Sequence, residues 1–396
     1  MPLSYVDAIA AVTATAPYAY YAELVAASLL QDKENGIWLA ASAAAVEAVL
    51  AEPLCRVRPV HEPVPKALQG SDAGTIFRHL VRMNDGAGHC PFKQAIAHTL
   101  QSVNAEHIAQ RVGQHARQLA AELYSPVDYA WLDQFALQMP VYGMASALGV
   151  PEADLPEVAV LMQDFVACLA AGSSALQLEQ GKQAAARLLA LFRRLLEQAS
   201  ADYTASSPSL LFTLAQQAAL LGRVDADVIV ANAIGFMSQA YEATAALIAN
   251  TLHVLACNET VRRQVAADPA FLHGCIAEVL RWDAPVQNTR RFAAEDCRVL
   301  GHTVRAGDTV LVVLAAANRD PAWNPQADVF DPRRRQRRCF SFGSGVHLCP
   351  GQQWAAQMAH AAISQLCGMP LDFSRLAKAR SFRASANIRM RLYAGT

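Results

Sequence analysis

The feature that most constrains this chain is a helical stretch of unusual length at residues 224–257. It contains one glycine, Gly235, and no proline, and its apolar residues recur at helical spacing. At 1.5 Å per residue, the stretch predicts a helix of about 50 Å, which would cross a whole molecule of this size. The rest of the fold has to be built around that helix.

Most of the remaining sequence is also predicted to be helical. Further helices are expected at 91–122, 153–171, 180–199 and 209–221. Short strands are expected at 36–41, 297–303, 309–315 and 387–393. Because no internal repeat and no linker interrupts the pattern, the sequence predicts one domain, residues 1–396, that is mainly α with small β-sheets.

Composition and charge exclude several classes of function. The chain has 396 residues, of which 53% are hydrophobic, and a formal charge of −1, so no overall field favours nucleic acid or a membrane. Residues 8–30 are apolar, but no Lys or Arg precedes them and Pro17 and Glu23 interrupt them. This favours a surface-packed helix over a signal peptide or membrane anchor. Nine cysteines without a CxxC pair argue against a zinc site or disulfide framework and predict a reducing, cytoplasmic location.

A glycine-rich loop, FSFGSGVHLCPG at residues 340–351, ends in a cysteine. Its glycines allow the backbone to approach a flat ligand closely. Pro350 suits the first position of a following helix, which would place Cys349 at a helix N-terminus where a thiolate is stabilised. Taken alone, such a cysteine is more often simply a buried side chain.

The spacing within this loop resembles the haem-binding loop of the cytochrome P450 family. Phe342, Gly345, Cys349 and Gly351 fit F-x-x-G-x-x-x-C-x-G, with His347 two residues before the cysteine. The resemblance implies that Cys349 ligates the iron of haem b as a thiolate, that Phe342 packs beside it, and that His347 contacts a haem propionate.

Other motifs follow in the order that this family requires. Glu278 and Arg281, in E-x-x-R, share one face of a predicted helix; alone, they could be an ordinary surface ion pair. In context they resemble the family's glutamate–arginine pair, and the resemblance implies that Arg334 joins their network. The resemblance to the family extends over nearly the full chain, from about Tyr18 to Tyr393.

The resemblance also indicates which basic residues contact the haem propionates. Arg291 aligns with one such arginine, and His89 and Lys93 fit H-x-x-x-R, with a lysine that keeps the charge but loses the bidentate fork. The cofactor-binding residues expected from the resemblance are Cys349, His347, Phe342, Gly343, Arg291, His89, Lys93 and Gly351.

The long helix departs from the family in the run SQAYEATA. Glu242 occupies the acid position, but Ala243 stands where the family has a threonine, and Gln239 replaces a small residue. Thr244 does not simply substitute, because one residue along a helix rotates the side chain by about 100°; an alignment shifted by one residue would restore the threonine. In the family the acid and the alcohol relay protons. Glu242 is therefore expected to relay them here, and Gln239, on the face of Ala243, to bond the distal ligand, a water or the substrate.

Pro350 is a second departure, since an aliphatic residue is common there. Proline has no N–H to hydrogen-bond the thiolate, which predicts more charge on the sulfur and a lower reduction potential. A run of arginines before the loop is either a solvated face or a docking surface for an acidic iron–sulfur partner. The run comprises Arg333, Arg334, Arg335, Arg337 and Arg338.

The resemblance implies a haem-thiolate monooxygenase of the soluble bacterial type, with haem between the long helix and the cysteine loop. It would insert one oxygen atom from O2 into a small or medium organic substrate, with electrons from ferredoxin and ferredoxin reductase. We expect a cytoplasmic monomer that binds neither nucleic acid nor a membrane. Two alternatives remain open: an enzyme that uses peroxide or catalyses dehydration, coupling or rearrangement, and a non-catalytic haem protein. The expected substrate pocket comprises Ile234, Ser238, Tyr241, Asn288 and Thr289, each of which alone would more often be core.

Overall fold

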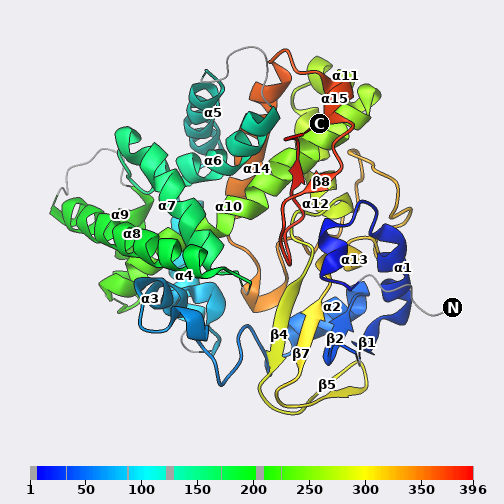
Figure 1. Ribbon diagram of the computed structural model, residues 1–396, viewed down its shortest axis with the longest axis horizontal. Coiled ribbons are helices and arrows are strands. Elements are labelled where there is room, and N and C mark those ends of the chain that lie inside the picture. Colours follow the sequence, from blue (N-terminus) through cyan, green and yellow to red (C-terminus); the bar gives the residue numbers. More distant parts are fainter. Residues whose placement is uncertain are drawn as a thin grey trace. The chain divides into compact units, whose positions relative to one another are not determined.

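The computed structural model describes residues 7–32, 34–86, 89–121, 129–170, 172–201, 209–223 and 225–395 (Figure 1). Its internal contacts divide the chain into two compact units. The first unit comprises Met1–Val60, Ala116–Ala136 and Glu242–Thr396, and the second comprises His61–His115 and Leu137–Tyr241. The expectation of a single domain stays a prediction.

A mixed sheet organises the first unit. Its strand order is β1-β2-β7-β4-β3, in which β2 and β7 are parallel and the other neighbours are antiparallel. The strands are β1 (Leu29–Asp32), β2 (Ile37–Ala40), β3 (Cys55–Arg56), β4 (Thr289–Ala293) and β7 (Thr309–Val312). Two small antiparallel pairs complete the strands: β5 (Cys297–Val299) with β6 (His302–Val304), and β8 (Ser381–Phe382) with β9 (Arg391–Leu392).

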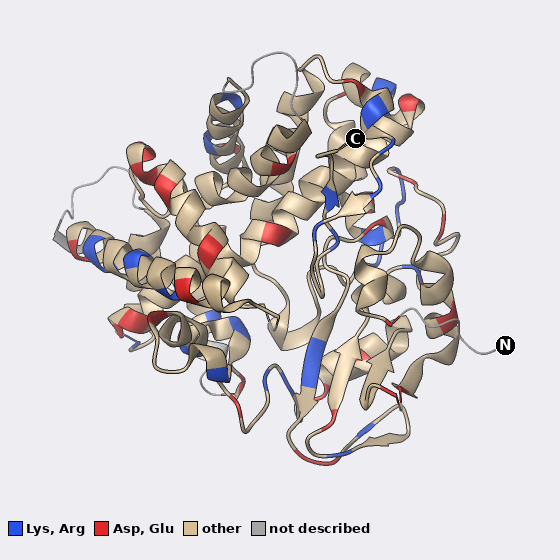
Figure 2. Ribbon diagram, viewed as in Figure 1, with Lys and Arg blue, Asp and Glu red and all other residues tan. Residues whose placement is uncertain are grey.

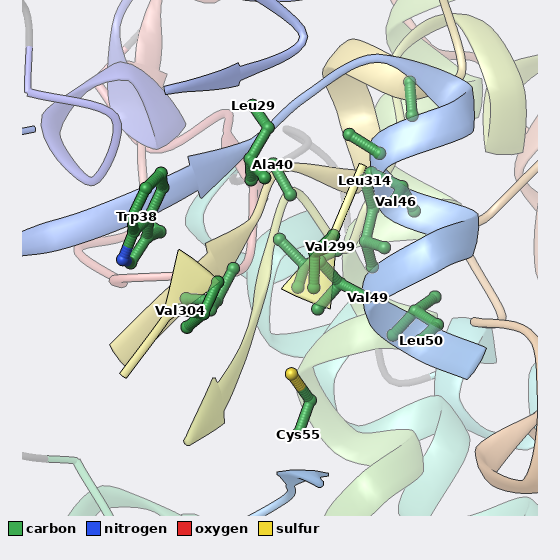
Figure 3. Close-up of a cluster of buried hydrophobic side chains, with 14 of the residues drawn as sticks. Leu29, Trp38, Ala40, Val46, Val49, Leu50, Cys55, Val299, Val304 and Leu314 are labelled. Atoms are coloured by element: carbon green, nitrogen blue, oxygen red, sulfur yellow. The ribbon is translucent and has the colours of Figure 1, made fainter. Parts of the chain in front are cut away.

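An apolar core fills the space between the first unit's strands and helix α2 (Ala43–Ala51). Val46, Val49 and Leu50 of α2 lie in one buried cluster with Val299 and Val304 (Figure 3). Ser42 caps this helix by accepting a hydrogen bond from the Ala45 N–H, which fixes the start of α2 shortly after the end of β2 in the sequence. A second buried cluster joins Tyr21 and Leu24 of α1 (Tyr18–Ala27) to α13 (Leu314–Ala317).

Further helices of the first unit follow the long helix in sequence. They are α11 (Glu259–Ala267), α12 (Phe271–Trp282), α14 (Gln352–Cys367) and α15 (Phe373–Leu376), with the 3-10 helix η6 (Gly345–His347). The 3-10 helix η1 (Ala10–Thr13) lies near the start of the chain. Residues 8–30 do not form the one surface-packed helix that we predicted. They form η1 and α1 and then enter β1, because the chain breaks at Pro17, the N-cap of α1.

The second unit consists of packed helices. Its helices are α3 (Asp72–His79), α4 (Cys90–Gln101), α7 (Leu155–Cys168), α8 (Ala175–Ala201) and α9 (Leu210–Leu220), with η2 (Lys66–Leu68), η3 (Val81–Met83) and η5 (Glu152–Asp154). Helices α7 and α8 approach closely at Gly181, where an added Cβ would come within 2.2 Å of Cys168 Cβ. Helices α5 (Ala105–Ala121) and α6 (Tyr129–Ala147) contribute residues to both units.

The long helix is confirmed as α10 (Ala226–Cys257), and Figure 1 shows its extent. Gly235 is required in its interior because a Cβ there would lie 2.7 Å from Leu80 Cδ2. Among the described residues, no helix has both the length and the apolar character that a membrane crossing requires.

Other sequence predictions also need correction. The predicted strand 309–315 ends as β7 at Val312, before α13 begins at Leu314, and of 387–393 only Arg391–Leu392 form a strand, β9. Residues 91–122 form two helices, because Asn104 accepts a hydrogen bond from the His107 N–H at 2.8 Å and starts α5 anew. The predicted strand 297–303 is a hairpin, because Leu300 and Gly301 take positive φ angles between β5 and β6. Residues 122, 171 and 224, at the ends of predicted helices, lie outside the described part of the chain.

Candidate haem and active site

The loop before α14 holds Cys349 by its backbone. The Cys349 N–H donates to the Phe342 carbonyl at 2.8 Å, and the Gly351 N–H donates to Cys349 Sγ at 3.4 Å. Gly343 and Gly345 take φ angles of 74° and 65°, which other residues rarely adopt. The result is a half-buried sulfur with a backbone donor directed at it, an arrangement suited to a thiolate ligand.

The position of Pro350 corrects one prediction. Helix α14 begins at Gln352 with Gly351 as its N-cap, so Pro350 lies before the helix and is not its first residue. The reason is local, since the Gly351 N–H is turned toward the sulfur of Cys349. Cys349 therefore precedes the first turn of α14, and its sulfur receives a backbone donor from the position that caps this helix.

Asn318, which the sequence analysis did not single out, anchors the start of the loop. Its Oδ1 accepts from the Phe340 N–H at 2.6 Å, and its Nδ2 donates to Ser341 Oγ at 3.0 Å. Asn318 is completely buried, and the Phe340 ring packs against Trp323 with centroids 5.2 Å apart. The loop thus leaves the core from a rigid base before it reaches the cysteine.

Glu278, Arg281 and Arg334 come together as expected. Glu278 Oε1 accepts from Arg281 Nη2 at 2.6 Å and from Arg334 Nε at 3.1 Å, and the side chains of Glu278 and Arg281 are fully buried. Burial alone would raise the pKa of Glu278, but hydrogen bonds from Arg281 and Arg337 outweigh it and hold this pKa below its ordinary value. An ordinary surface pair is thereby excluded.

A fourth member of this network, Arg337, was missed as a binding partner. Its Nε donates to Glu278 Oε2 at 2.8 Å. One carboxylate cannot balance three guanidinium groups, so backbone carbonyl oxygens supply the remaining acceptors. These are Asn318 O, Ala327 O and Val329 O for Arg281, Pro325 O, Gln326 O and Val329 O for Arg334, and Pro332 O for Arg337.

The arginine run is therefore not one uniform surface. Arg334 and Arg337 point to Glu278, whereas Arg333, Arg335 and Arg338 are exposed. The guanidinium of Arg333 lies 4.8 Å from the centre of the Phe271 ring, and that of Arg338 lies 4.7 Å from that of Trp323. The sequence could not separate these two groups because the five residues are of one type and nearly adjacent.

Arg291 lies on β4 and is 6% exposed. Its Nη1 donates to Arg290 O at 2.9 Å and to Thr289 Oγ1 at 3.4 Å. Asn288, one of the predicted pocket residues, is buried and donates from its amide to Ala386 O at 2.9 Å. Contact of Arg291 with a propionate, and of Asn288 and Thr289 with substrate, stay predictions.

In the second unit, His89 and Lys93 lie at the start of α4. The Lys93 N–H donates to the His89 carbonyl at 2.9 Å, so the two residues are one helical turn apart on one face. His89 is 2% exposed, and Lys93 is half-buried. A lysine and a histidine so placed suit an anionic group, and their role toward a propionate stays a prediction.

The middle of α10 is more open than its flanks. Gln239 is exposed, and Ser238, Glu242 and Ala243 are partly exposed, whereas Ile234, Tyr241 and Thr244 are buried. The Gln239 amide donates to Gly235 O at 2.9 Å, one turn earlier. Because Ala243 is partly exposed while Thr244 is 2% exposed, the burial pattern supports Ala243 at the threonine position and argues against a register shifted by one residue.

Glu242 carries the one charge in the central part of α10, which is otherwise uncharged after Asp227 in its first turn (Figure 2). Glu242 Oε1 lies 3.2 Å from Arg383 Nε, in the segment after β8. The two side chains are 23% and 32% exposed, respectively. Arg383 was not identified by sequence analysis, because it lies 141 positions away and belongs to none of the motifs.

Another network, which the sequence analysis did not identify, surrounds Asp283. Arg389 Nε donates to Asp283 Oδ1 at 2.9 Å, and Tyr18 donates its hydroxyl to the same carboxylate oxygen. Arg389 also donates to Val12 O and Ala14 O, so it ties the segment after β8 to the N-terminal residues. Its role is structural.

Comparison with solved structures identifies the architecture. CalO2 superposes with a TM-score of 0.81 over 93% of this chain and 91% of that chain at 23% identity. P450BioI, in complex with a hexadec-9Z-enoic acid ligated acyl carrier protein, superposes with a TM-score of 0.76 over 88% and 90% at 22% identity. The fold is that of the cytochromes P450.

Comparison of the amino-acid sequence with a family model and with related proteins agrees with this fold. The cytochrome P450 family model matches residues 210–367, which include α10, the Glu278 network and the Cys349 loop. Residues 210–367 therefore belong to the cytochrome P450 family, and the fold of the chain is the fold of that family. The chain is 29% identical to vitamin D(3) 25-hydroxylase of Pseudonocardia autotrophica over 71% of its own length and 68% of that relative. It is 28% identical to cytochrome P450 monooxygenase PikC of Streptomyces venezuelae over 88% and 83%.

A third relative matches a shorter region at higher identity. The 20-oxo-5-O-mycaminosyltylactone 23-monooxygenase of Streptomyces fradiae is 35% identical over 40% of this chain, and the match spans 37% of that relative. The relatives are hydroxylases and monooxygenases, so this P450 is an oxidoreductase of the monooxygenase type that binds haem, iron protoporphyrin IX. The thiol donor, the glycine-lined loop and the adjacent N–H of Gly351 fit that cofactor.

Proposed function

We propose that this P450 inserts one atom of O2 into a small or medium organic substrate, with electrons from a ferredoxin and its reductase. The observation that carries the proposal is the setting of Cys349, whose half-buried sulfur receives a backbone N–H at the start of α14. When bound, haem supplies the dioxygen activation, and a thiolate ligand favours O–O cleavage.

The proposed cofactor contacts follow from the chain's own side chains. Cys349 holds the iron, and Phe342 and the loop glycines pack beside the ring. Arg291 from β4, His347 from η6, and His89 with Lys93 from α4 bind the propionates. Arg291 keeps its charge when it is buried and suits an anionic propionate, and the imidazole of His89 can donate a hydrogen bond to one.

On the distal side we assign proton relay to Glu242. It is the one carboxylate in the central part of α10, and it is partly exposed, as a relay between solvent and a bound group requires. Ala243 provides no hydroxyl, so a water held by the Gln239 amide takes that place. In the present arrangement the amide donates to Gly235 O at 2.9 Å, and in the proposed mechanism it exchanges this intrahelical bond for one to the water.

The ferredoxin surface that we propose is smaller than the arginine run. Arg333, Arg335 and Arg338 are exposed, whereas Arg334 and Arg337 are committed to Glu278. Val346 and Leu348 of the haem loop are 63% and 45% exposed and supply apolar contacts. Raised salt should weaken docking, because the pairing is between exposed charges.

The location and the substrate follow from further observations. The eight cysteines whose side chains are described are free thiols, which supports a cytoplasmic location, and we propose a monomer. The names of the relatives include vitamin D(3) and 20-oxo-5-O-mycaminosyltylactone, so a medium-sized organic molecule is the substrate class we propose. Ser238 and Thr289 are the polar groups proposed to orient it, within an otherwise apolar lining of Ile234 and Tyr241.

A second candidate function rests on Ala243. Without the alcohol of the family's acid–alcohol pair, an enzyme that uses peroxide, or that catalyses dehydration, coupling or rearrangement, needs no proton relay to O2. The two candidates differ in their oxidant. Product formed with reduced pyridine nucleotide, reductase and ferredoxin supports the first, and product formed with hydrogen peroxide alone supports the second.

The test is a screen for ligands that shift the ferric Soret band, followed by turnover of each hit. The proposal predicts oxygenated product that depends on ferredoxin and carries one labelled oxygen atom from ¹⁸O₂. Product without label from O2, or formed equally well with peroxide alone, contradicts the leading candidate. Arg333→Gln, Arg335→Gln and Arg338→Gln together should slow reduction by ferredoxin, and unchanged reduction rules out the docking surface.

A further inference from the structure

The ion pair between Glu242 and Arg383 is neither a surface contact nor a buried one. The Nε–Oε1 distance is 3.2 Å, and the side chains are 23% exposed for Glu242 and 32% exposed for Arg383. Both residues belong to the first unit. Partial burial reduces the screening by water, so the guanidinium restrains the carboxylate more than a fully solvated partner would.

The backbone of Arg383 is fixed by the β8–β9 pair. Its N–H donates to Met390 O at 2.9 Å, which extends the pairing of Phe382 with Arg391. The preceding Phe382 ring lies under two guanidinium groups, 4.0 Å from that of Arg389 and 4.6 Å from that of Arg391. Arg383 therefore starts from a well-defined position.

The same segment is tied to α10 two turns after Glu242. Asn250 Nδ2 donates to Arg389 O at 2.9 Å, and Asn250 Oδ1 accepts from the Arg391 N–H at 3.4 Å. The Tyr393 hydroxyl donates to Ala249 O at 2.7 Å. Asn250 is fully buried, so water does not compete for these hydrogen bonds. The helix that carries Glu242 and the strand segment that carries Arg383 are thus held in register.

The two oxygens of the Glu242 carboxylate are not equivalent. Arg383 holds Oε1, and within the described part of the chain neither Oε2 nor the terminal nitrogens of Arg383 have another partner. A glutamate side chain has three rotatable bonds, and its neighbour Ala243 offers no hydroxyl to restrain it. Arg383 is therefore the group that sets which way the carboxylate faces.

We propose that Arg383 is the positioning residue for the proton-relay carboxylate: by holding Oε1 of Glu242, it presents Oε2 as the oxygen that takes up and hands on protons. This inference rests on the proposed function, in which Glu242 relays protons. It explains how an acid without the neighbouring alcohol keeps a productive orientation. A proton enters at Oε2 from water and leaves from the same oxygen, so the Oε1 contact with Arg383 persists.

The test is a double-mutant cycle in the holoenzyme. The variants are Arg383→Gln, Glu242→Gln and the double substitution, with Arg383→Lys as rescue and Arg380→Gln as control, because exposed Arg380 bonds Ala377 O and Ala379 O rather than Glu242. The measurement is the fraction of electrons recovered as product rather than hydrogen peroxide, with ferredoxin, reductase and a ligand that the wild type converts. The reduced carbon-monoxide spectrum of each variant serves as the check on haem insertion.

We expect Arg383→Gln to lower the product fraction about two- to fivefold, the ratio that a partly screened ion pair supports. Arg383→Lys should restore most of the loss, and Arg380→Gln should match the wild type. In the Glu242→Gln background, removing Arg383 should cause no further loss, because the residue then has nothing to position. A purely structural role would instead give losses that multiply.

Losses that multiply, or an unchanged product fraction in Arg383→Gln, overturn the inference while the proposed function stands. A wild type that forms no product from any bound ligand with ferredoxin and reductase overturns the proposed function, and the inference with it. A Glu242→Gln variant that retains full product yield removes the relay itself and leaves the haem assignment intact.

Discussion

Arg337 Nε donates to Glu278 Oε2 at 2.8 Å, while Arg281 and Arg334 share Oε1 of the same carboxylate. Three cations on one buried acid fix the segment between residues 318 and 337, whose carbonyl oxygens also accept from these arginines. That segment leads directly into the Cys349 loop. The network therefore acts on the haem loop through the backbone that precedes it.

Replacement of Arg337 tests this relationship. Arg337→Ala leaves Oε2 of a fully buried carboxylate without its donor, which should lower the free energy of unfolding by about 1–3 kcal/mol. Denaturant titration of the holoenzyme measures it. The matched control is Arg335→Ala, an exposed neighbour expected to change stability by less than about 0.5 kcal/mol. Equal stability of the two variants would show that Arg337 is only a surface residue.

The pairing of Asp283 predicts a dependence on pH. Burial alone would raise the pKa of Asp283, but Arg389 and the Tyr18 hydroxyl hold it below its ordinary value of 3.8. A carboxyl with a lowered folded-state pKa stabilises the fold above its unfolded pKa, and this contribution is lost as pH falls through the folded value. Asp283→Asn should therefore cost about 3–5 kcal/mol near neutral pH.

The difference in unfolding free energy between wild type and Asp283→Asn should narrow as the pH is lowered below 3.8. Unfolding titrations at neutral pH and below this value measure the two differences. A difference in unfolding free energy that does not change with pH would mean that the charge of the Asp283 carboxylate contributes nothing to stability.

The missing N–H at Pro350 predicts the electronic properties of the sulfur. In the structure the Gly351 N–H donates to Cys349 Sγ at 3.4 Å, and Pro350 has no N–H to donate. Pro350→Leu adds a donor, which should raise the reduction potential by up to about 40 mV, equivalent to about 1 kcal/mol for one electron. Spectroelectrochemistry of both proteins decides the matter, and equal potentials refute the prediction.

Restoring the alcohol tests the distal assignment. Ala243→Thr places a hydroxyl beside Glu242 on the partly exposed face of α10. One added hydrogen bond of about 1 kcal/mol should raise the fraction of electrons that form product by up to about fivefold. Thr244→Ala is the control, because its side chain is buried and should not affect the yield. Unchanged yield in Ala243→Thr would make the missing hydroxyl irrelevant.

Uninterrupted helical spacing predicted α10. The resemblance of the motifs around Cys349 and Glu278 to those of the cytochrome P450 family predicted the loop and the arginine partners of Glu278. The roles of Arg383, Arg337 and Asn318 were not predicted, because each side chain bonds an element that is distant in sequence. No spacing rule links Arg383 to Glu242, which lies 141 positions away. Helix ends were misplaced where single hydrogen bonds decide them, as at Asn104 and Gly351.

The central claim is that the sulfur of residue 349 ligates the haem iron, and the reduced carbon-monoxide difference spectrum tests it most directly. The wild type should give the Soret band characteristic of thiolate-bound haem, and Cys349→Ala should lose this band. A Cys349→Ala protein with the wild-type thiolate spectrum would contradict the account.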